Sequence, residues 1–261
     1  MSLVISSTSN PKVKDIVQLL TKSKERKSRG LCIVEGAREI NRALASNWVP
    51  KELWQLEGSD VPLQSASFPN YYKATPKVFQ KLAYRNTTEC AVAVFAVPAS
   101  GMNEYQELLE SAKCLLVLEG IEKPGNLGAC LRTACAAGVD AVILADSAVD
   151  PYSPNVIRNS TGALFEIPVI TASSEELIRS FNSNGRKVYV TNLHEDAHSM
   201  FNIKWPNKCA IVLGEEANGL SKTWVTNDFE NIIIPMEGET IDSLNVSVSA
   251  ALLMYQWRSQ Q

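Results

Sequence analysis

The segment CLLVLEGIEKPGNLGACLRTACAAGVDAVILAD, residues 114–146, decides the fold class of this chain. An apolar run of strand length leads through a turn with Pro and Gly into a helical stretch, and a second apolar run follows. Gly138 closes the predicted helix, as a glycine commonly does. A strand, a helix and a second strand in this order predict a mostly parallel sheet whose two faces are covered by helices.

The alternation continues on the carboxyl side of this segment. Short apolar runs there have the length of strands, and two further stretches are helical in pattern. We expect strands at 167–170, 187–192, 209–215 and 231–236, and helices at 153–164 and 243–259.

The amino-terminal part alternates on a smaller scale. Asn10 and Pro11 are a suitable N-cap and first residue for a helix, and a small α/β unit is expected up to Val97. The segment 98–104 contains Pro, Ser and Gly and is the predicted linker. We therefore expect a first domain over 1–97 and a second over 105–261.

The composition is that of an ordinary globular protein, with 45% hydrophobic and 20% charged residues in 261. The sequence has no run of about 18 apolar residues and does not begin with the pattern of a secretory signal, so we expect neither a membrane span nor export. Six cysteines are scattered without a C-x-x-C pair, and several lie in apolar runs. This favours buried, reduced thiols in a cytoplasmic protein.

The charge is distributed unevenly along the chain. The formal net charge is −3, but residues 10–29 contain seven basic and two acidic residues. Such a patch can bind phosphate groups even on an acidic protein, although the count alone fits a solvated helix end equally well. The candidate contacts are Lys12, Lys14, Lys24, Arg26, Lys27, Arg29 and Arg38.

Other functions are suggested only by short, weak motifs. The turn GNLG at 125–128 lacks the full G-x-G-x-x-G of a dinucleotide site, and no G-x-x-x-x-G-K-[ST] phosphate loop occurs. HEDAH at 194–198 would bind zinc on a helix through His194 and His198, with Glu195 as base. It follows a strand-like run and has no obvious third ligand beyond Glu215 or Glu216. We therefore expect a polar surface loop and no metal.

Three stretches of the second half are more informative together than separately. They are NLGACLRTACAAG at 126–138, IVLGEEANGLS at 211–221 and IIIPMEGETIDSLNVSVSAALLMY at 232–255. The last two contain loops at the carboxyl ends of predicted strands, where α/β sheets bind ligands. Backbone groups freed there can hydrogen-bond an adenine edge, and four apolar side chains can sandwich its rings. These side chains are Leu213, Ile234, Met236 and Leu244.

In this order, the three stretches resemble the motifs of the SpoU/TrmH family of RNA ribose methyltransferases, which belongs to the SPOUT superfamily. The family's Asn, and its Arg six residues later, fall on Asn126 and Arg132. Its Gly-x-x-x-x-Gly-Leu loop falls on 214–220, and its Pro-Met and Ser-Leu-Asn-Val-Ser on 235–236 and 243–247.

Two further regions strengthen the resemblance. Residues 150–169 are similar to the family's linking segment, with Arg158 and Ser160 at its polar positions. The first half is similar to an accessory RNA-binding domain with the fold of ribosomal proteins that bind kinked RNA. The basic stretch lies in this region, which favours RNA contacts for its charges.

The resemblance implies a fold and an activity. The fold is α/β, with a C-terminal parallel-sheet domain that carries a deep trefoil knot and a smaller N-terminal α/β domain. The activity is transfer of the methyl group of S-adenosylmethionine to a ribose 2′-hydroxyl, without a metal, by a homodimer. Members with the accessory domain commonly modify 23S rRNA, which we favour over tRNA. A catalytically idle RNA-binding protein is the non-enzyme alternative.

The resemblance also assigns the site residues. The implied catalytic set is Asn126, Arg132, Glu215, Ser243 and Asn245. The donor is expected around Leu213, Gly214, Gly219, Ile234, Met236 and Leu244. Whether Arg132 accepts the proton or orients the hydroxyl stays open, because an arginine pKa above about 12 makes a general base difficult without help.

Two positions depart from the family pattern. The loop between Pro235 and Leu244 is one residue longer than usual, which bears on donor geometry. Lys123 stands where many members have Asp, which changes the local charge more than the chemistry.

Overall fold

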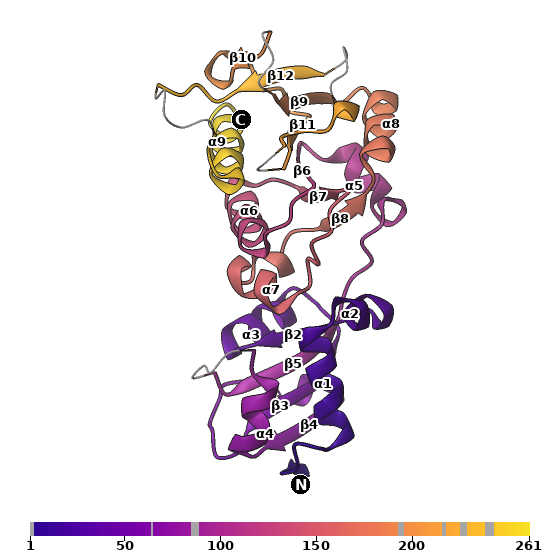
Figure 1. Ribbon diagram of the computed structural model, residues 1–261, viewed down its shortest axis with the longest axis vertical. Helices are drawn as coiled ribbons and strands as arrows, with labels where there is room; N and C mark the ends of the chain where they lie inside the picture. The colour runs from indigo at the N-terminus through magenta and orange to yellow at the C-terminus, as the bar shows by residue number, and fades with distance from the viewer. Residues whose placement is uncertain are drawn as a thin grey trace. The chain divides into compact units, whose positions relative to one another are not determined.

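The computed structural model describes residues 3–63, 65–84, 89–192, 196–215, 218–224, 229–237 and 243–261 (Figure 1). The chain divides into two compact units. The first holds Met1–Pro98 together with Asp150–Phe165, and the second holds Ala99–Val149 together with Glu166–Gln261.

The first unit is built on a five-stranded mixed sheet in the order β1-β4-β3-β5-β2. Its strands are β1 (Leu3–Ile5), β2 (Leu31–Glu35), β3 (Pro50–Leu56), β4 (Asn70–Ala74) and β5 (Ala91–Ala96). Its first four helices are α1 (Pro11–Thr21), α2 (Ser23–Arg29), α3 (Ala37–Ala45) and α4 (Pro76–Leu82). Asn10 caps α1 as expected, since its side-chain oxygen accepts the Lys12 N–H at 2.9 Å.

A fifth helix of the first unit, α7 (Pro154–Ser160), comes from the segment between two strands of the second unit. It packs on β2. The ring of Trp48 makes edge contacts with Tyr152 and Phe165, at centroid distances of 5.9 and 4.9 Å. Residues 150–165, most of the segment that resembles the family's linking segment, therefore belong to the first unit.

The second unit contains a seven-stranded sheet in the order β10-β12-β9-β11-β6-β7-β8, with every pairing parallel. The strands are β6 (Cys114–Glu119), β7 (Ala141–Ala145), β8 (Val169–Ala172), β9 (Lys187–Thr191), β10 (His198–Ser199), β11 (Cys209–Leu213) and β12 (Glu230–Ile233). The predicted parallel α/β sheet is confirmed. The trefoil knot stays a prediction from the resemblance.

Helices cover both faces of this sheet, which is why β6, β7 and β11 are buried along their whole length. Figure 1 shows α6 (Pro124–Ala137) and α9 (Val246–Arg258) side by side on one face, and α5 (Gln106–Ser111) and α8 (Ser174–Asn184) on the other. Helix α9 begins three residues later than predicted, because Asn245 is its N-cap and accepts the Ser247 N–H at 2.9 Å.

The H-E-x-x-H segment lies only partly within the described ranges. His198 lies on β10 and pairs with Ile232 rather than standing on a helix, while His194 and Glu195 lie outside the described residues. Among the residues that the structure describes, no group of three or more His, Cys, Asp or Glu could hold a metal ion. In the same part of the chain, no helix is long and apolar enough to cross a membrane.

Candidate active site

Residues from all three motifs line one cavity at the carboxyl ends of β6 and β11. Its volume is about 110 Å³. Asn126 comes from the first motif, Gly214 and Glu215 from the second, and Val246 from the third. The rest of the lining is Gly120, Ile121, Glu122 and Lys123. The carboxyl edge of a parallel sheet is where such folds bind ligands.

Two of the predicted catalytic residues are in direct contact. The side-chain amide of Asn245 donates to the side-chain oxygen of Asn126 at 3.2 Å. The Asn245 oxygen accepts the N–H of Ser247 at 2.9 Å and its hydroxyl at 2.6 Å. Asn245 therefore caps α9 and orients Asn126 on α6 at the same time, so the two helices share one polar contact at the site.

The loop after β11 is tightly folded. A Cβ at Gly214 would collide with the backbone of Gly219 and Leu220, so only glycine fits there. Glu215 and Gly219 exchange two backbone hydrogen bonds, at 3.0 and 2.9 Å, and Gly219 has a φ of +68°. The Glu215 carboxylate accepts the Asn218 side-chain amide at 2.6 Å. The acidic residue of the second motif is thus held within its own loop.

Arg132 lies on α6 with an exposed side chain, and no hydrogen bond or ion pair holds it among the described residues. Within the described ranges, Arg132 therefore forms no structural ion pair with an acidic neighbour. Ser243 is also exposed, two residues before Asn245. Burial raises the pKa of the nearby Cys130 thiol to about 12, so this cysteine stays protonated and is a poor nucleophile.

The residues predicted to bind the donor are divided between two hollows. Ile234, Met236 and Leu244 line a largely apolar hollow of about 750 Å³ together with side chains of α9. Gly214 lines the 110 Å³ cavity instead, which is smaller than the roughly 300–1,000 Å³ of typical ligand pockets and would hold only part of a nucleoside. Leu213 is buried at the end of β11, and Gly219 is exposed.

The seven basic residues of the first unit that were predicted to contact RNA fall into three groups. Lys14, Lys24 and Lys27 are exposed, and no interaction partner for them occurs within the described ranges. Three others are exposed but engaged. These are Lys12, whose pKa is raised by a hydrogen bond with Tyr72; Arg29, whose pKa is raised by its hydrogen bonds to Asp15; and Arg38, which is paired with Glu39 at 2.6 Å.

Arg26 forms the third group and corrects the sequence-based expectation. Its side chain is buried, and its Nε and Nη2 atoms lie 2.7 Å from one Asp150 carboxylate oxygen. Nη1 donates to the Leu19 carbonyl oxygen at 2.5 Å. A buried guanidinium needs such partners, which leaves it unavailable to RNA. The spacing of the basic stretch does not distinguish this inward-facing arginine from its neighbours.

Sequence reasoning missed one polar cluster at the same sheet edge. Glu119 is the last residue of β6 and is buried, with hydrogen bonds to Ser174 and Ser221. The available signal was a carboxylate at the end of the apolar run CLLVLE, because a buried carboxylate requires specific partners.

Comparisons with known proteins agree with this geometry. Residues 113–255 match the SpoU rRNA Methylase family, and residues 10–93 match an MRM3-like substrate binding domain. Over 254 residues, the chain is 31% identical to the 23S rRNA (guanosine(2553)-2′-O)-methyltransferase RlmP of Bacillus subtilis (strain 168), covering 97% of this chain and 98% of the relative.

Two solved structures are similar over nearly the full chain. An RNA 2′-O ribose methyltransferase is 37% identical with a TM-score of 0.82, covering 99% of both chains. The AdoMet-bound rRNA methyltransferase from Sinorhizobium meliloti is 26% identical with a TM-score of 0.85, covering 98% of this chain and 97% of that one.

Proposed function

Since the chain belongs to the SpoU rRNA methylase family, we propose that it transfers the methyl group of S-adenosylmethionine to a ribose 2′-hydroxyl of RNA. One observation carries the proposal. Asn126, Gly214, Glu215 and Val246, which come from three separated motifs, line a single cavity at the carboxyl edge of the sheet.

The residues at this edge suit a nucleoside-type donor. The backbone at Gly214 lies where any Cβ would collide with the loop, and Met236 and Leu244 expose apolar side chains along the separate apolar hollow. Backbone groups near Gly214 would hold the adenine edge, and Ile234 and Leu244 would contact its rings. When bound, S-adenosylmethionine would supply a sulfonium methyl group, which an oxygen nucleophile can attack with release of S-adenosylhomocysteine.

The chain's own polar residues would align the acceptor. Asn126 is held by Asn245, so its side chain is pre-oriented at the site where an incoming ribose or Arg132 would be positioned. The exposed Arg132 guanidinium would bind a backbone phosphate or the ribose oxygen as negative charge develops. Glu215 would serve the active site or the dimer interface, and Ser243 would help to hold the catalytic loop.

The favoured target is 23S rRNA. The Bacillus subtilis relative is named for a guanosine of 23S rRNA, and the alignment spans both units of this chain. The match of residues 10–93 to a substrate binding domain supports RNA capture by the first unit. A tRNA target remains the alternative within the same chemistry.

The test is transfer of labelled methyl from S-adenosylmethionine to two RNAs, unmodified 23S rRNA and bulk tRNA. We expect label on the ribosomal RNA. Label on tRNA alone would retain the chemistry and overturn the target. Label on neither RNA, from a protein that still binds RNA, would favour the catalytically idle alternative.

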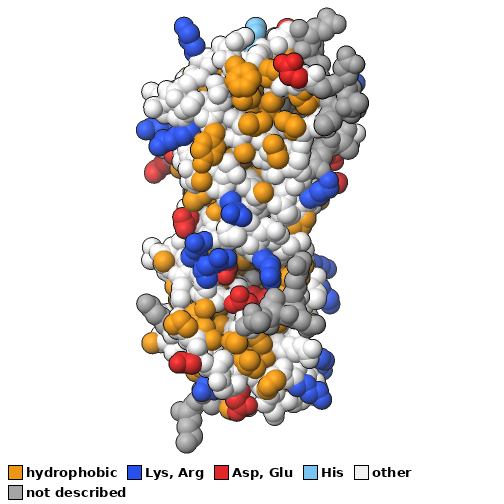
Figure 2. All heavy atoms as spheres, turned by 90° about the vertical axis from the view of Figure 1, so that its left-hand side faces the viewer, with side chains coloured by type: hydrophobic (Ala, Val, Ile, Leu, Met, Phe, Trp, Pro, Cys, Tyr) orange, Lys and Arg blue, Asp and Glu red, His pale blue; other side chains and the backbone are white. Residues whose placement is uncertain are grey.

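We also propose that the protein acts as a homodimer through α9 and its surroundings. Figure 2 shows hydrophobic side chains gathered on one face of the second unit. The exposed large apolar residues there are Phe201, Met236, Leu244, Val248, Leu252 and Tyr255. An apolar surface of this kind beside a site is typical of an interface. Continuity of this surface with the donor hollow supports a site close to the partner subunit.

Light scattering during gel filtration tests the dimer. A charge at Leu252 would be buried unpaired in the interface, so Leu252→Asp should elute as a monomer while the wild type elutes as a dimer. Lys81→Asp, on the first unit, is the control and should stay dimeric. A wild-type monomer would contradict the proposal.

We also propose that the protein acts in the cytoplasm. The six cysteines form no disulfide, and four of them are buried. Reduced thiols in this number are typical of cytoplasmic proteins.

A further inference from the structure

The Glu119 carboxylate is a hydrogen-bond centre that none of the family motifs includes. Its Oε1 atom accepts the hydroxyl of Ser221 at 2.6 Å and that of Ser174 at 3.0 Å. Its Oε2 atom accepts the backbone N–H of Ser221 at 2.7 Å. The side chain is 7% exposed, and no cation pairs with it among the described residues. Three donors therefore converge on one buried acceptor group.

This cluster joins three elements of the second unit. Glu119 ends β6, Ser174 begins α8, and Ser221 follows the loop that leaves β11. The Trp224 indole N–H donates to the Ser174 hydroxyl at 3.0 Å, and the Ser174 N–H donates to Asp146 at 2.9 Å. The cluster is thus anchored on the α8 side by two further hydrogen bonds.

The loop after β11 is held at both of its ends. The loop after β11 is fixed at its start, where Gly214 contacts the backbone of Gly219 and Leu220. Its far end, Ser221, is fixed by both hydrogen bonds to Glu119. Without Glu119, the part-buried Ser221 N–H would lose its acceptor, and the far end of the loop would lose both of these hydrogen bonds.

We propose that Glu119 is a positioning residue for the donor site, holding the loop of Gly214, Glu215 and Asn218–Ser221 in its binding geometry. This inference rests on the proposed function. Glu119 touches neither donor nor acceptor directly in this account. It acts through Ser221, so its loss should weaken donor binding and raise the donor KM much more than it lowers kcat.

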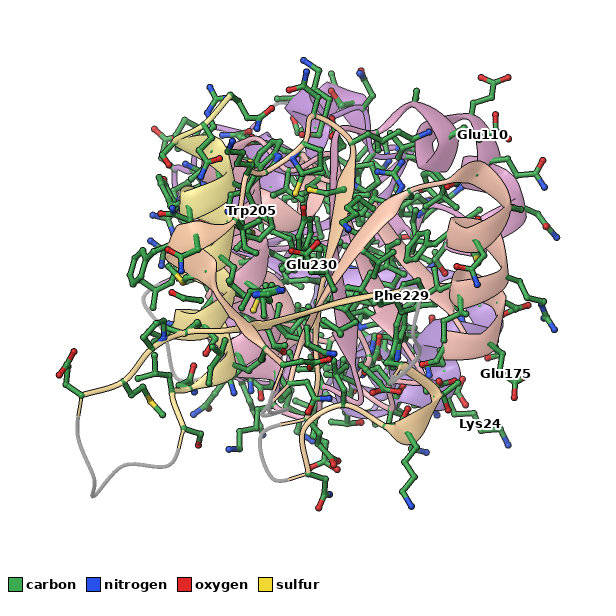
Figure 3. The ribbon with its side chains drawn as sticks, turned by 90° about the horizontal axis from the view of Figure 1, so that it is seen from above. Lys24, Glu110, Glu175, Trp205, Phe229 and Glu230 are labelled. Atoms are coloured by element: carbon green, nitrogen blue, oxygen red, sulfur yellow. The ribbon has the colours of Figure 1, made fainter. Side chains whose placement is uncertain are left out.

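Two substitutions separate hydrogen bonding from space filling. Glu119→Leu has similar bulk but accepts no hydrogen bond. Glu119→Gln lacks the charge, yet its oxygen can accept the Ser221 N–H while its amide donates to the two serine hydroxyls, which can rotate. The control is Glu175→Leu. Glu175 is adjacent to Ser174 in sequence, but its side chain is exposed and projects outward from α8 (Figure 3).

The experiment is calorimetry of S-adenosylhomocysteine binding to the full chain, with RNA affinity and thermal unfolding measured in parallel. Glu119→Leu should bind at least about tenfold more weakly than the wild type, which corresponds to the loss of one buried hydrogen bond. Glu119→Gln should stay within about threefold of the wild type and Glu175→Leu should match it. RNA affinity should be unchanged in all variants.

Wild-type affinity in folded Glu119→Leu would overturn the inference and leave the proposed function intact. A wild-type protein that does not bind S-adenosylhomocysteine would overturn the proposed function itself, and this inference with it. If Glu119→Leu does not fold, Ser221→Ala decides by the same measurement. It retains the backbone hydrogen bond and should bind about threefold more weakly, whereas unchanged affinity would overturn the inference.

Discussion

The basic stretch of the first unit and the motif loops of the second unit differ in how well the sequence predicts where their side chains lie in the fold. The seven cations of the basic stretch look alike in the sequence, but their surroundings in the structure differ. Arg26 is buried, Arg29 is paired with Asp15, and Lys24 is among those that are exposed. In the second, Asn126 and Asn245 lie 119 positions apart in the chain and form a hydrogen bond. Composition does not distinguish the buried cation from the exposed ones, whereas the motifs identify both residues of a contact that the structure then shows.

The largest effect is expected on stability when the buried, paired Arg26 is replaced. Arg26→Met leaves the Asp150 carboxylate buried without its cation, which should destabilise the first unit by about 3–5 kcal/mol. Arg29→Met, which removes the exposed pair with Asp15, should cost no more than about 1 kcal/mol. Urea unfolding measures both. Equal losses would mean that burial does not separate the two arginines.

Arg132→Ala tests the motif side of the comparison. The substitution removes an exposed cation without a structural partner in the described ranges, so stability should be unchanged. Methyl transfer should fall by about 10²–10³-fold or more, since charge stabilisation in the transition state is lost. Binding of S-adenosylhomocysteine should be retained. Full activity in this variant would refute the assigned role of Arg132.

Gly214→Ala tests whether the loop geometry, and not only its sequence, binds the donor. The added methyl group would collide with the backbone of Gly219 and Leu220, and the loop would have to shift. S-adenosylhomocysteine affinity should fall by about tenfold or more, as measured by calorimetry. Gly125→Ala is the matched control, because a Cβ there meets nothing within 4 Å on α6. Similar losses in both variants would contradict the argument.

The smallest effect is expected from the exposed lysines. Replacing Lys24 and Lys27 with Ser should weaken RNA binding several-fold and reduce the slope of log affinity against log salt by about 1–2. Lys77 and Lys81 on α4 are also exposed, and replacing them with Ser makes the same change in charge. Filter binding at several salt concentrations compares the two. Identical effects would show that net charge, not the basic stretch, controls RNA affinity.

Much of the fold could be predicted because its strands are apolar runs that need burial on both faces. The elements that were missed lack this signal. Strand β10 is only His198–Ser199 and forms by pairing with β12, which no local pattern indicates. Helix α8 buries few apolar residues, chiefly Leu177 and Phe181, and its start is fixed by a capping box between Ser173 and Glu176.

The site could be predicted only as far as its motifs extend. The motifs specify both Asn126 and Asn245, although not the hydrogen bond between them. The hydrogen bonds of Glu119 join residues up to 102 positions apart through serines, which are common in any sequence. The pairing of Arg26 with Asp150 spans 124 positions of the chain. Such long-range polar contacts require coordinates.

The central claim is that the methyl group is placed on a ribose 2′-hydroxyl, and alkaline digestion of the labelled RNA product tests it most directly. In alkali, the free 2′-hydroxyl attacks the adjacent phosphodiester, and a 2′-O-methyl group blocks that cleavage. The account predicts that the label will be recovered in an alkali-resistant dinucleotide. Label recovered in mononucleotides would place the methyl group on a base and would contradict the account.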